Sequence, residues 1–272
     1  ICDAEFMHHK LAHVQVTLHS HAHIMTSQLT YSEGNALQVK EQSTANVVES
    51  KVAYSQLAQC HISEKSVFNS NDSFFTNGEQ VGIYAERASV AQLMRSTVSN
   101  HASSALSAVE SSLRLDDCDV FENVGNAVLL LNSSDVVAED CRFYQNDMPH
   151  FAGKTNAFIT VRRSTLAKGK SLYALDESNV LLEQCHIHDS EGIQLEVQQR
   201  TKMYIHQCTI AAGQSNGIKA SGQSYVELTD SQVSDHRFPQ LVFDDSQLIV
   251  RNCELHSGQE NGIILENDAE GF

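Results

Sequence analysis

Apolar and polar residues alternate along most of this chain, and the alternating segments recur at a nearly constant interval. A small residue, serine or cysteine, closes each segment, and consecutive closing residues lie 21 to 23 positions apart. The closing positions are Ser27, Ser50, Ser73, Ser96, Cys118, Cys141, Ser164, Cys185, Cys208, Ser231 and Cys253. The chain is therefore a repeat protein, and the repeat predicts its architecture.

Three sets of positions keep an apolar character relative to the closing residue. The positions two after it and five before it are apolar in every repeat, and the position three before it is apolar except at Ser70. Residues two apart on a strand point to the same face, so these positions predict β-strands with one buried face. A second alternating pair lies further upstream, for example Leu37 with Val39. Each repeat should hold two or three short strands.

A repeat of this length without helical periodicity does not fit a helical solenoid. We expect each repeat to form one coil of an all-β parallel solenoid, with every strand paired to its copies above and below. Eleven coils with a rise of about 4.8 Å each would make a rod about 50 Å long. Glycines such as Gly82, Gly125 and Gly217 precede the upstream pair. We expect a tight bend there that requires a residue without Cβ.

These columns resemble the right-handed parallel β-helix superfamily, the pectate-lyase-like fold. The resemblance covers almost the whole chain and concerns the fold and the repeat, without a catalytic motif. It implies a right-handed coil, and the unbroken repeat predicts one domain over residues 1–272. The superfamily includes polysaccharide lyases and hydrolases, periplasmic copper-pathway proteins and eukaryotic scaffold domains. The repeat columns continue to Phe6 at one end and to Leu265 at the other. We therefore expect the domain to be part of a longer protein.

Composition and charge narrow the range of functions. The net charge of -16 argues against binding nucleic acid or an anionic membrane, because both need basic patches. No run of eighteen apolar residues predicts a membrane span. Aromatic residues make up 7% of the chain and tryptophan is absent, which leaves few platforms for sugar rings.

Cysteine and histidine residues raise the question of disulfides and metal sites. Five of the seven cysteines occupy closing positions, where serine stands in other repeats, so we expect buried free thiols and weakly favour a reducing, cytoplasmic compartment. His23 shares an outward column with Asn46, Asn69 and Gln92, which favours a solvated polar face over a metal site. We expect no metal ion and no cofactor.

The strongest candidate for chemistry is an outward ladder two positions before the closing residues. Its middle stretch reads Asp116, Glu139, Arg162, Glu183 and His206 on five consecutive repeats. Adjacent carboxylates can hold a cation or share a proton, and an arginine or histidine beside them can contact a sugar carboxylate or act as a base. Alternating charges are also the ordinary way to stabilise an exposed sheet.

Family motifs give the ladder no support as an active site. The galacturonan hydrolases of this fold carry GHG and RxK sequences; this chain has no GHG, and its one RxK triplet, Arg200 to Lys202, stands far from its paired acids in the sequence. The paired acids Asp116/Asp117 and Asp244/Asp245 stand without those partners. Repeats of nearly constant length also leave no long loops to wall a cleft.

Two functions stay open. The first is a non-enzymatic scaffold or interaction module that presents an extended acidic surface to a protein partner. The second is a carbohydrate-active module, a lyase, hydrolase or binder, that uses the ladder to bind a polysaccharide. A pocket lined by Asp116, Glu139 and Arg162 would favour the second. A smooth face on which each acid is neutralised by its ladder neighbour would favour the first.

Overall fold

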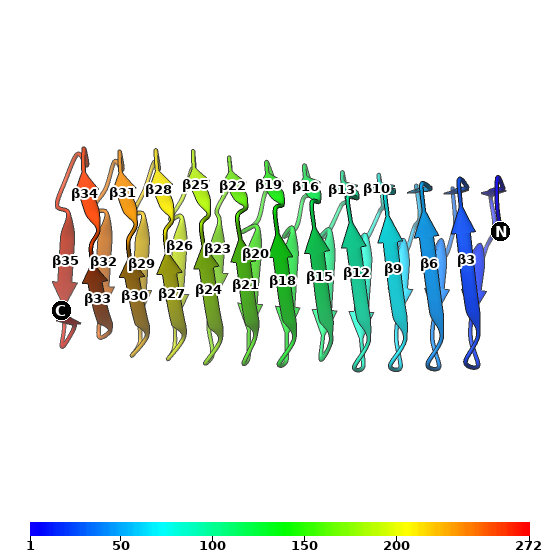
Figure 1. Ribbon diagram of the computed structural model, residues 1–272, viewed down its shortest axis with the longest axis horizontal. Coiled ribbons are helices and arrows are strands. Elements are labelled where there is room, and N and C mark those ends of the chain that lie inside the picture. The colour runs from blue at the N-terminus through cyan, green and yellow to red at the C-terminus, as the bar shows by residue number, and fades with distance from the viewer.

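The computed structural model describes residues 1–272 and folds them into a straight rod of stacked coils (Figure 1). Each coil contributes one strand to each of three parallel sheets, and every sheet contains twelve strands. The predicted all-β, right-handed parallel β-helix is confirmed. The twelfth strand of each sheet comes from partial coils at the two ends, which pair in register although they lack a complete repeat.

Sheet A is built from the five-residue strands that precede each closing residue, together with one short strand at the end. Its strands are β3 (His21–Met25), β6 (Thr44–Val48), β9 (Val67–Asn71), β12 (Val90–Met94), β15 (Ser112–Asp116), β18 (Asp135–Glu139), β21 (Phe158–Arg162), β24 (Asn179–Glu183), β27 (Lys202–His206), β30 (Tyr225–Thr229), β33 (Gln247–Arg251) and β36 (Glu270–Gly271).

Sheet B is built from the three-residue strands that follow each closing residue. Its strands are β1 (Glu5–Met7), β4 (Gln28–Thr30), β7 (Lys51–Ala53), β10 (Phe74–Thr76), β13 (Thr97–Ser99), β16 (Asp119–Phe121), β19 (Arg142–Tyr144), β22 (Thr165–Ala167), β25 (His186–His188), β28 (Thr209–Ala211), β31 (Gln232–Ser234) and β34 (Glu254–His256).

Sheet C is built from the upstream pair of each repeat. Its strands are β2 (Val14–Val16), β5 (Leu37–Val39), β8 (Cys60–Ile62), β11 (Ile83–Glu86), β14 (Leu106–Val109), β17 (Val128–Leu131), β20 (Phe151–Lys154), β23 (Leu172–Ala174), β26 (Leu195–Gln198), β29 (Ile218–Ser221), β32 (Leu241–Asp244) and β35 (Ile263–Glu266). The chain forms no helix with the length and hydropathy needed to cross a bilayer.

The interior of the rod is a continuous apolar core lined by all three sheets. Val120 pairs with Phe143, and Ile187 pairs with Ile210, as the column two places after the closing residue predicts. All four side chains are fully buried. A fully buried aliphatic or aromatic side chain of this size contributes about 1.5–3 kcal/mol, so each column stabilises the rod along its whole length.

The closing residues bridge consecutive coils through hydrogen bonds. The backbone N–H of Ser27 donates to Ser50 Oγ over 3.0 Å, and Ser50 Oγ donates to the carbonyl of Val48 over 2.7 Å. Cysteine does the same where it replaces serine, since the N–H of Cys118 lies 3.4 Å from Cys141 Sγ. The position therefore needs a short side chain that both accepts and donates a hydrogen bond, which explains why only these two residue types occur there.

The cysteines are free thiols, and five of the seven are buried. One of the five, Cys60, lies outside the closing column, and burial raises the pKa of its thiol. Cys253, which does occupy the column, is only partly buried because it lies near the end of the rod. Cys118 and Cys141 are stacked on neighbouring coils. The backbone N–H of Cys118 donates to Sγ of Cys141, and the two cysteines form no disulfide.

The explanation predicted for the glycines was wrong. None of Gly82, Gly125 and Gly217 has a positive φ. The bends at which φ is positive are mostly occupied by other residue types, such as Glu49 with a φ of 47°. A Cβ on Gly82 would lie 2.6 Å from the carbonyl oxygen of Ala105 in the next coil. These positions need glycine because the neighbouring coil comes too close, and the backbone angle is not the reason.

A chain of buried polar side chains runs through the corner between sheets B and C. His101 Nε2 lies 3.0 Å from Gln59 Oε1, and His101 Nδ1 lies 3.0 Å from Asn123 Oδ1. Asn123 Nδ2 donates to Asn146 Oδ1 over 2.8 Å. Asn146 Nδ2 in turn lies 3.0 Å from Nδ1 of the fully buried His150. Buried polar groups are costly unless hydrogen-bonded, and this chain links them from coil to coil, with the single N–H of a neutral His101 donating to one of its two amide neighbours.

The buried histidine His150 should make the stability of the rod depend on pH. Its Nε2 lies 3.0 Å from the carbonyl of Ala167 and its Nδ1 faces the Asn146 amide, so the neutral ring satisfies both nitrogens. Burial lowers the pKa of His150 from 6.5 to about 4. The unfolded state therefore binds more protons between these two values, and the free energy of unfolding should fall as pH decreases through this window.

Urea denaturation at about pH 4.5 and pH 7 measures this effect, for which we expect on the order of 2 kcal/mol from His150. His150→Gln keeps a polar side chain of similar reach but removes the titration, so its unfolding free energy should depend less on pH. An equal pH dependence in the parent and in His150→Gln would contradict the assignment. Carboxylates whose pKa is lowered by arginines, such as Glu139 and Asp140, also stabilise the folded state. They lose this contribution to the free energy of unfolding as the pH falls below the ordinary carboxylate range.

Candidate functional site

The strands of sheet A place three side chains of each coil on the outside of the rod. In β15, Leu113 and Leu115 point into the core while Ser112, Arg114 and Asp116 point outward. Because the pairing is parallel and in register, equivalent residues of successive coils line up in three outward columns. The last of these columns contains the predicted charge ladder.

The structure brings the five ladder residues together in the predicted order. Asp116 pairs with Glu139, Glu139 with Arg162, Arg162 with Glu183, and Glu183 with His206. They therefore stand side by side on β15, β18, β21, β24 and β27, with a rise of about 4.8 Å from one to the next. Their role in ligand binding stays a prediction.

Arginines neutralise the middle of the ladder. Arg162 lies 3.0 Å from Glu139 through Nη1 and 3.0 Å from Glu183 through Nε, so its guanidinium bridges both carboxylates. Arg163 adds a contact of 2.8 Å to Glu139. Hydrogen bonds from Arg163 and Arg162 lower the pKa of Glu139. Arg162 is therefore engaged by two protein carboxylates, which neutralise its charge.

The two ends of the ladder differ from its middle. His206 Nδ1 lies 2.9 Å from Thr229 Oγ1 and 3.5 Å from Asp230 Oδ2. At the other end Asp116 is exposed, and its carboxylate makes no ion pair and no hydrogen bond within the protein. The ladder is therefore not one uniform site, because Asp116 is free while Glu139, Arg162 and Glu183 satisfy one another.

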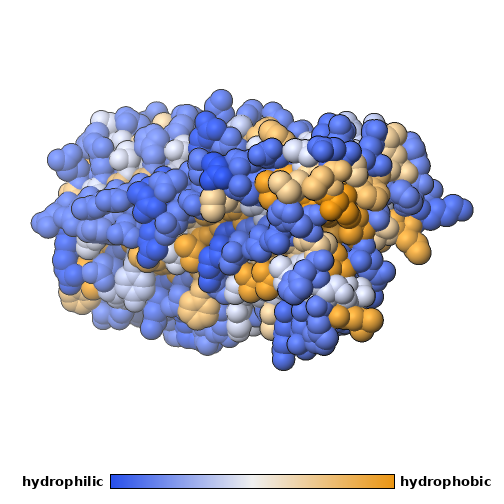
Figure 2. Space-filling model, turned by 45° about the vertical axis from the view of Figure 1, so that its right-hand side comes forward, coloured by the Kyte–Doolittle hydropathy of each residue, from blue (hydrophilic) through white to orange (hydrophobic).

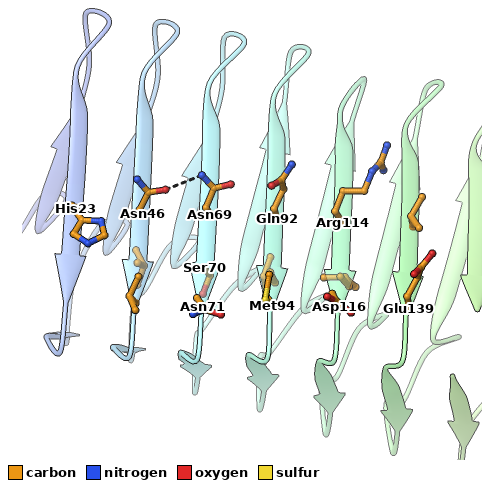
Figure 3. Close-up of a pocket in the computed structure, with 15 residues that line it drawn as sticks. His23, Asn46, Asn69, Ser70, Asn71, Gln92, Met94, Arg114, Asp116 and Glu139 are labelled. Carbon is orange, nitrogen blue, oxygen red and sulfur yellow. Dashed lines mark hydrogen bonds between the residues drawn. The ribbon is translucent and has the colours of Figure 1, made fainter. Parts of the chain in front are cut away.

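An open trough of about 510 Å³ begins at β3 and ends at β18 on the outer face of sheet A (Figure 3). Its lining residues are His23, Asn46, Val47, Val48, Asn69, Ser70, Asn71, Gln92, Leu93, Met94, Arg114, Leu115, Asp116, Val137 and Glu139. We call this surface the trough. It contains Asp116 and Glu139 from the predicted ladder, whereas Arg162, Glu183 and His206 lie outside it.

One column of the trough carries amide side chains. His23, Asn46, Asn69, Gln92 and Arg114 follow one another on consecutive strands, as Figure 3 shows. Asn69 Nδ2 donates to Asn46 Oδ1 over 2.8 Å, which leaves Asn46 Nδ2 and Asn69 Oδ1 without a partner. The amide of Gln92 is exposed and makes no hydrogen bond within the protein. The column therefore presents both donors and acceptors to a ligand.

Apolar groups lie beside these amides. Met94 is 42% exposed, and Val48 and Val137 are partly exposed on the same face. Figure 2 shows apolar residues gathered toward the N-terminal half of this side of the rod, while the other half is mainly hydrophilic. The trough thus combines aliphatic surface with uncommitted polar atoms. No long loop borders it, in agreement with the nearly constant coil length.

The sequence placed these residues outward but did not reveal the trough. His23, Asn46, Asn69 and Gln92 were interpreted as a solvated polar column. The available signal was the run of polar residues at this position over consecutive coils. Further along the rod the same column holds Val137, Thr160 and Leu181, so the polar run is confined to one part of the face. The structure also contains no group of three or more histidine, cysteine, aspartate or glutamate side chains that could hold a metal ion.

Comparisons with known proteins identify the repeat and the fold. The family model described as "Right handed beta helix region" matches residues 12–157 and 150–271. The chain resembles the tailspike protein gp49 of Pseudomonas phage LKA1, with a TM-score of 0.54 and 15% identity over 94% of this chain and 51% of that chain. It therefore spans about half the length of the tailspike. No curated protein matches the chain.

Two further solved structures align with most of the chain at lower similarity. The A-module of the mannuronan C-5 epimerase AlgE4 from Azotobacter vinelandii has a TM-score of 0.49 and 10% identity, over 92% of this chain and 86% of that chain. The catalytic domain of a GH87 α-1,3-glucanase, in complex with tetrasaccharides, has a TM-score of 0.49 and 8% identity, over 99% of this chain and 64% of that chain.

The ion pairs of the ladder should contribute little to stability. Glu139 and Arg162 are about one-third exposed, and exposed pairs are typically worth roughly 0–1 kcal/mol. We therefore expect Glu139→Gln to change the free energy of unfolding by less than about 1 kcal/mol in urea denaturation, with a smaller effect at high salt. A loss several times larger, unaffected by salt, would show that the ladder holds the sheet together.

Proposed function

The chain belongs to the right-handed β-helix family, and from this premise we propose that it binds a polysaccharide on the outer face of sheet A. The trough that begins at β3 and ends at β18 is the proposed binding surface. Gln92, Asn46 and Asn69 would exchange hydrogen bonds with sugar hydroxyls. Asp116 would accept hydrogen bonds from hydroxyls at the neighbouring coil.

The observation that carries the proposal is the presence of uncommitted polar atoms next to aliphatic surface. Gln92 and Asp116 are exposed without partners in the protein, and Met94 lies on the strand of Gln92 and pairs with Asp116 on the adjacent strand. A sugar ring presents hydroxyl groups at its rim and C–H groups on its faces, so a mixed surface of this kind matches it. Ligand sites generally combine apolar contact area with a few convergent polar groups.

The open shape of the trough supports a polymer over a small molecule. Small ligands are usually enclosed in concave pockets that bury most of their surface. This surface instead follows six strands of sheet A and is not closed by loops. A chain of sugar residues can lie along such a surface and make one set of contacts per coil.

The scaffold hypothesis accounts for a different part of the same face. From Glu139 to Glu183 the charges neutralise one another, as expected for an exposed sheet that is merely stabilised by its ladder. The scaffold hypothesis does not account for the free amides and free carboxylate of the trough. We therefore rank polysaccharide binding first and protein interaction second.

Binding of the intact chain to a panel of soluble polysaccharides tests the proposal. Affinity electrophoresis with β-glucan, mannan, galactan, xylan, polygalacturonate and alginate should reveal retardation by at least one polymer. We expect Gln92→Ala and Asp116→Ala each to weaken binding to that polymer about fivefold to tenfold, since each removes a hydrogen-bonding group. Neither variant should shift the melting temperature appreciably, because both side chains are exposed.

A matched control separates this site from the rest of the face. Gln247→Ala removes the same side chain from β33 of sheet A, outside the trough, and should leave binding unchanged. Failure of every polymer to retard the chain would contradict the proposal. Equal losses in Gln92→Ala and Gln247→Ala would place the binding surface elsewhere.

A further inference from the structure

The charges of the trough indicate which polysaccharides it accepts. We propose that the trough binds a neutral polysaccharide, laid along the axis of the rod, and discriminates against polyuronates. This inference rests on the proposed function and specifies its ligand. It differs from the expectation raised by the sequence, in which Arg162 was a candidate partner for a sugar carboxylate.

Arginines in and beside the trough are already bound to protein carboxylates. Arg95, beside the trough, contacts Asp72 through Nε at 2.8 Å and through Nη2 at 2.9 Å. Arg114 forms an ion pair with Asp135 and also donates to the carbonyl of Leu113 over 2.8 Å. With Arg162 held between two glutamates as well, each of these guanidinium groups already faces a protein carboxylate that neutralises its charge, which weakens its attraction for a uronate.

The free charge in the trough is negative. Asp116 forms no ion pair, although Arg95 lies near enough to interact with it electrostatically, and its ladder neighbour Glu139 is also a carboxylate. Like charges close together near a protein surface repel, and the repulsion grows as water is excluded from between them. His23 stands at the other end of the trough, on β3, four strands of sheet A away from β15. A bound uronate beside Asp116 would therefore meet a carboxylate that no ion pair neutralises.

The orientation follows from the spacing of the amides. Asn46, Asn69 and Gln92 are paired residues on adjacent strands, so they repeat along the rod axis at about 4.8 Å. A polymer running along the axis meets all three in succession. One running across the sheet meets the outward residues of a single coil, where β9 offers Val67, Asn69 and Asn71. The axial orientation uses more of the unpaired amide groups.

Neutral and acidic polymers with the same backbone provide the test. Polygalacturonate and its fully methyl-esterified form share a backbone and differ at the carboxyl group, which is charged in the first and a neutral methyl ester in the second; galactan, mannan and β-glucan extend the neutral set. We expect one or more neutral polymers to bind, with an affinity that changes little with salt, and polygalacturonate and alginate to bind at least tenfold more weakly. Measurements with and without calcium exclude bridging of a uronate to Asp116 by a cation.

Two variants sharpen the result. Asp116→Asn removes the free charge of the trough and should bring polygalacturonate binding closer to that of its methyl ester. Glu254→Gln makes the same change in net charge on the outer face of sheet B and should have no such effect. If the two variants behave alike, the discrimination comes from net charge and the inference about the trough fails.

The outcomes separate this inference from the proposed function. Binding of acidic polymers as tightly as neutral ones, or more tightly, would overturn the inference and leave polysaccharide binding intact. Binding of no polymer at all would overturn both. Preference for neutral polymers that is lost in Asp116→Asn but kept in Glu254→Gln would support both.

Discussion

Parallel hydrogen bonding between successive coils forces every coil to keep the register of the coil before it. The serine and cysteine residues at the corner between sheets A and B strengthen this register, because each short side chain accepts a backbone N–H from one coil and donates to a carbonyl in its own. The core columns depend on the same register, since Val120 meets Phe143 only when the coils align. A shift by one residue would turn the apolar side chains outward.

The same register creates the outer face on which function depends. Residues that lie 21 to 23 positions apart in the sequence become neighbours at about 4.8 Å, so a property repeated over several coils becomes a continuous surface. Where the repeated residues are opposite charges, as at Glu139, Arg162 and Glu183, they satisfy one another. Where they are amides, as at Asn46, Asn69 and Gln92, polar atoms are left available to a ligand.

The fold could be predicted from the sequence because burial repeats at fixed positions and apolar columns are visible without a structure. The order of the ladder followed from the same columns. The ion pairs did not, because whether Arg162 contacts Glu139, Glu183 or solvent depends on side-chain conformations that periodicity does not encode. The trough was missed for a related reason, since its hollow depends on how the outward side chains of six neighbouring strands lie, which periodicity does not encode either. The glycines were misinterpreted because their constraint comes from the adjacent coil, as at Gly82.

Oxidative footprinting of methionines tests most directly whether a polysaccharide occupies the trough. Met94 lines the trough and is 42% exposed, whereas Met148 is 51% exposed and lies outside it. Both thioethers can be oxidised to sulfoxides in the free protein, and a bound ligand shields only what it covers. With a saturating polymer that retards the chain, we predict slower oxidation of Met94 and an unchanged rate at Met148. Equal rates at Met94 with and without the polymer would contradict the account.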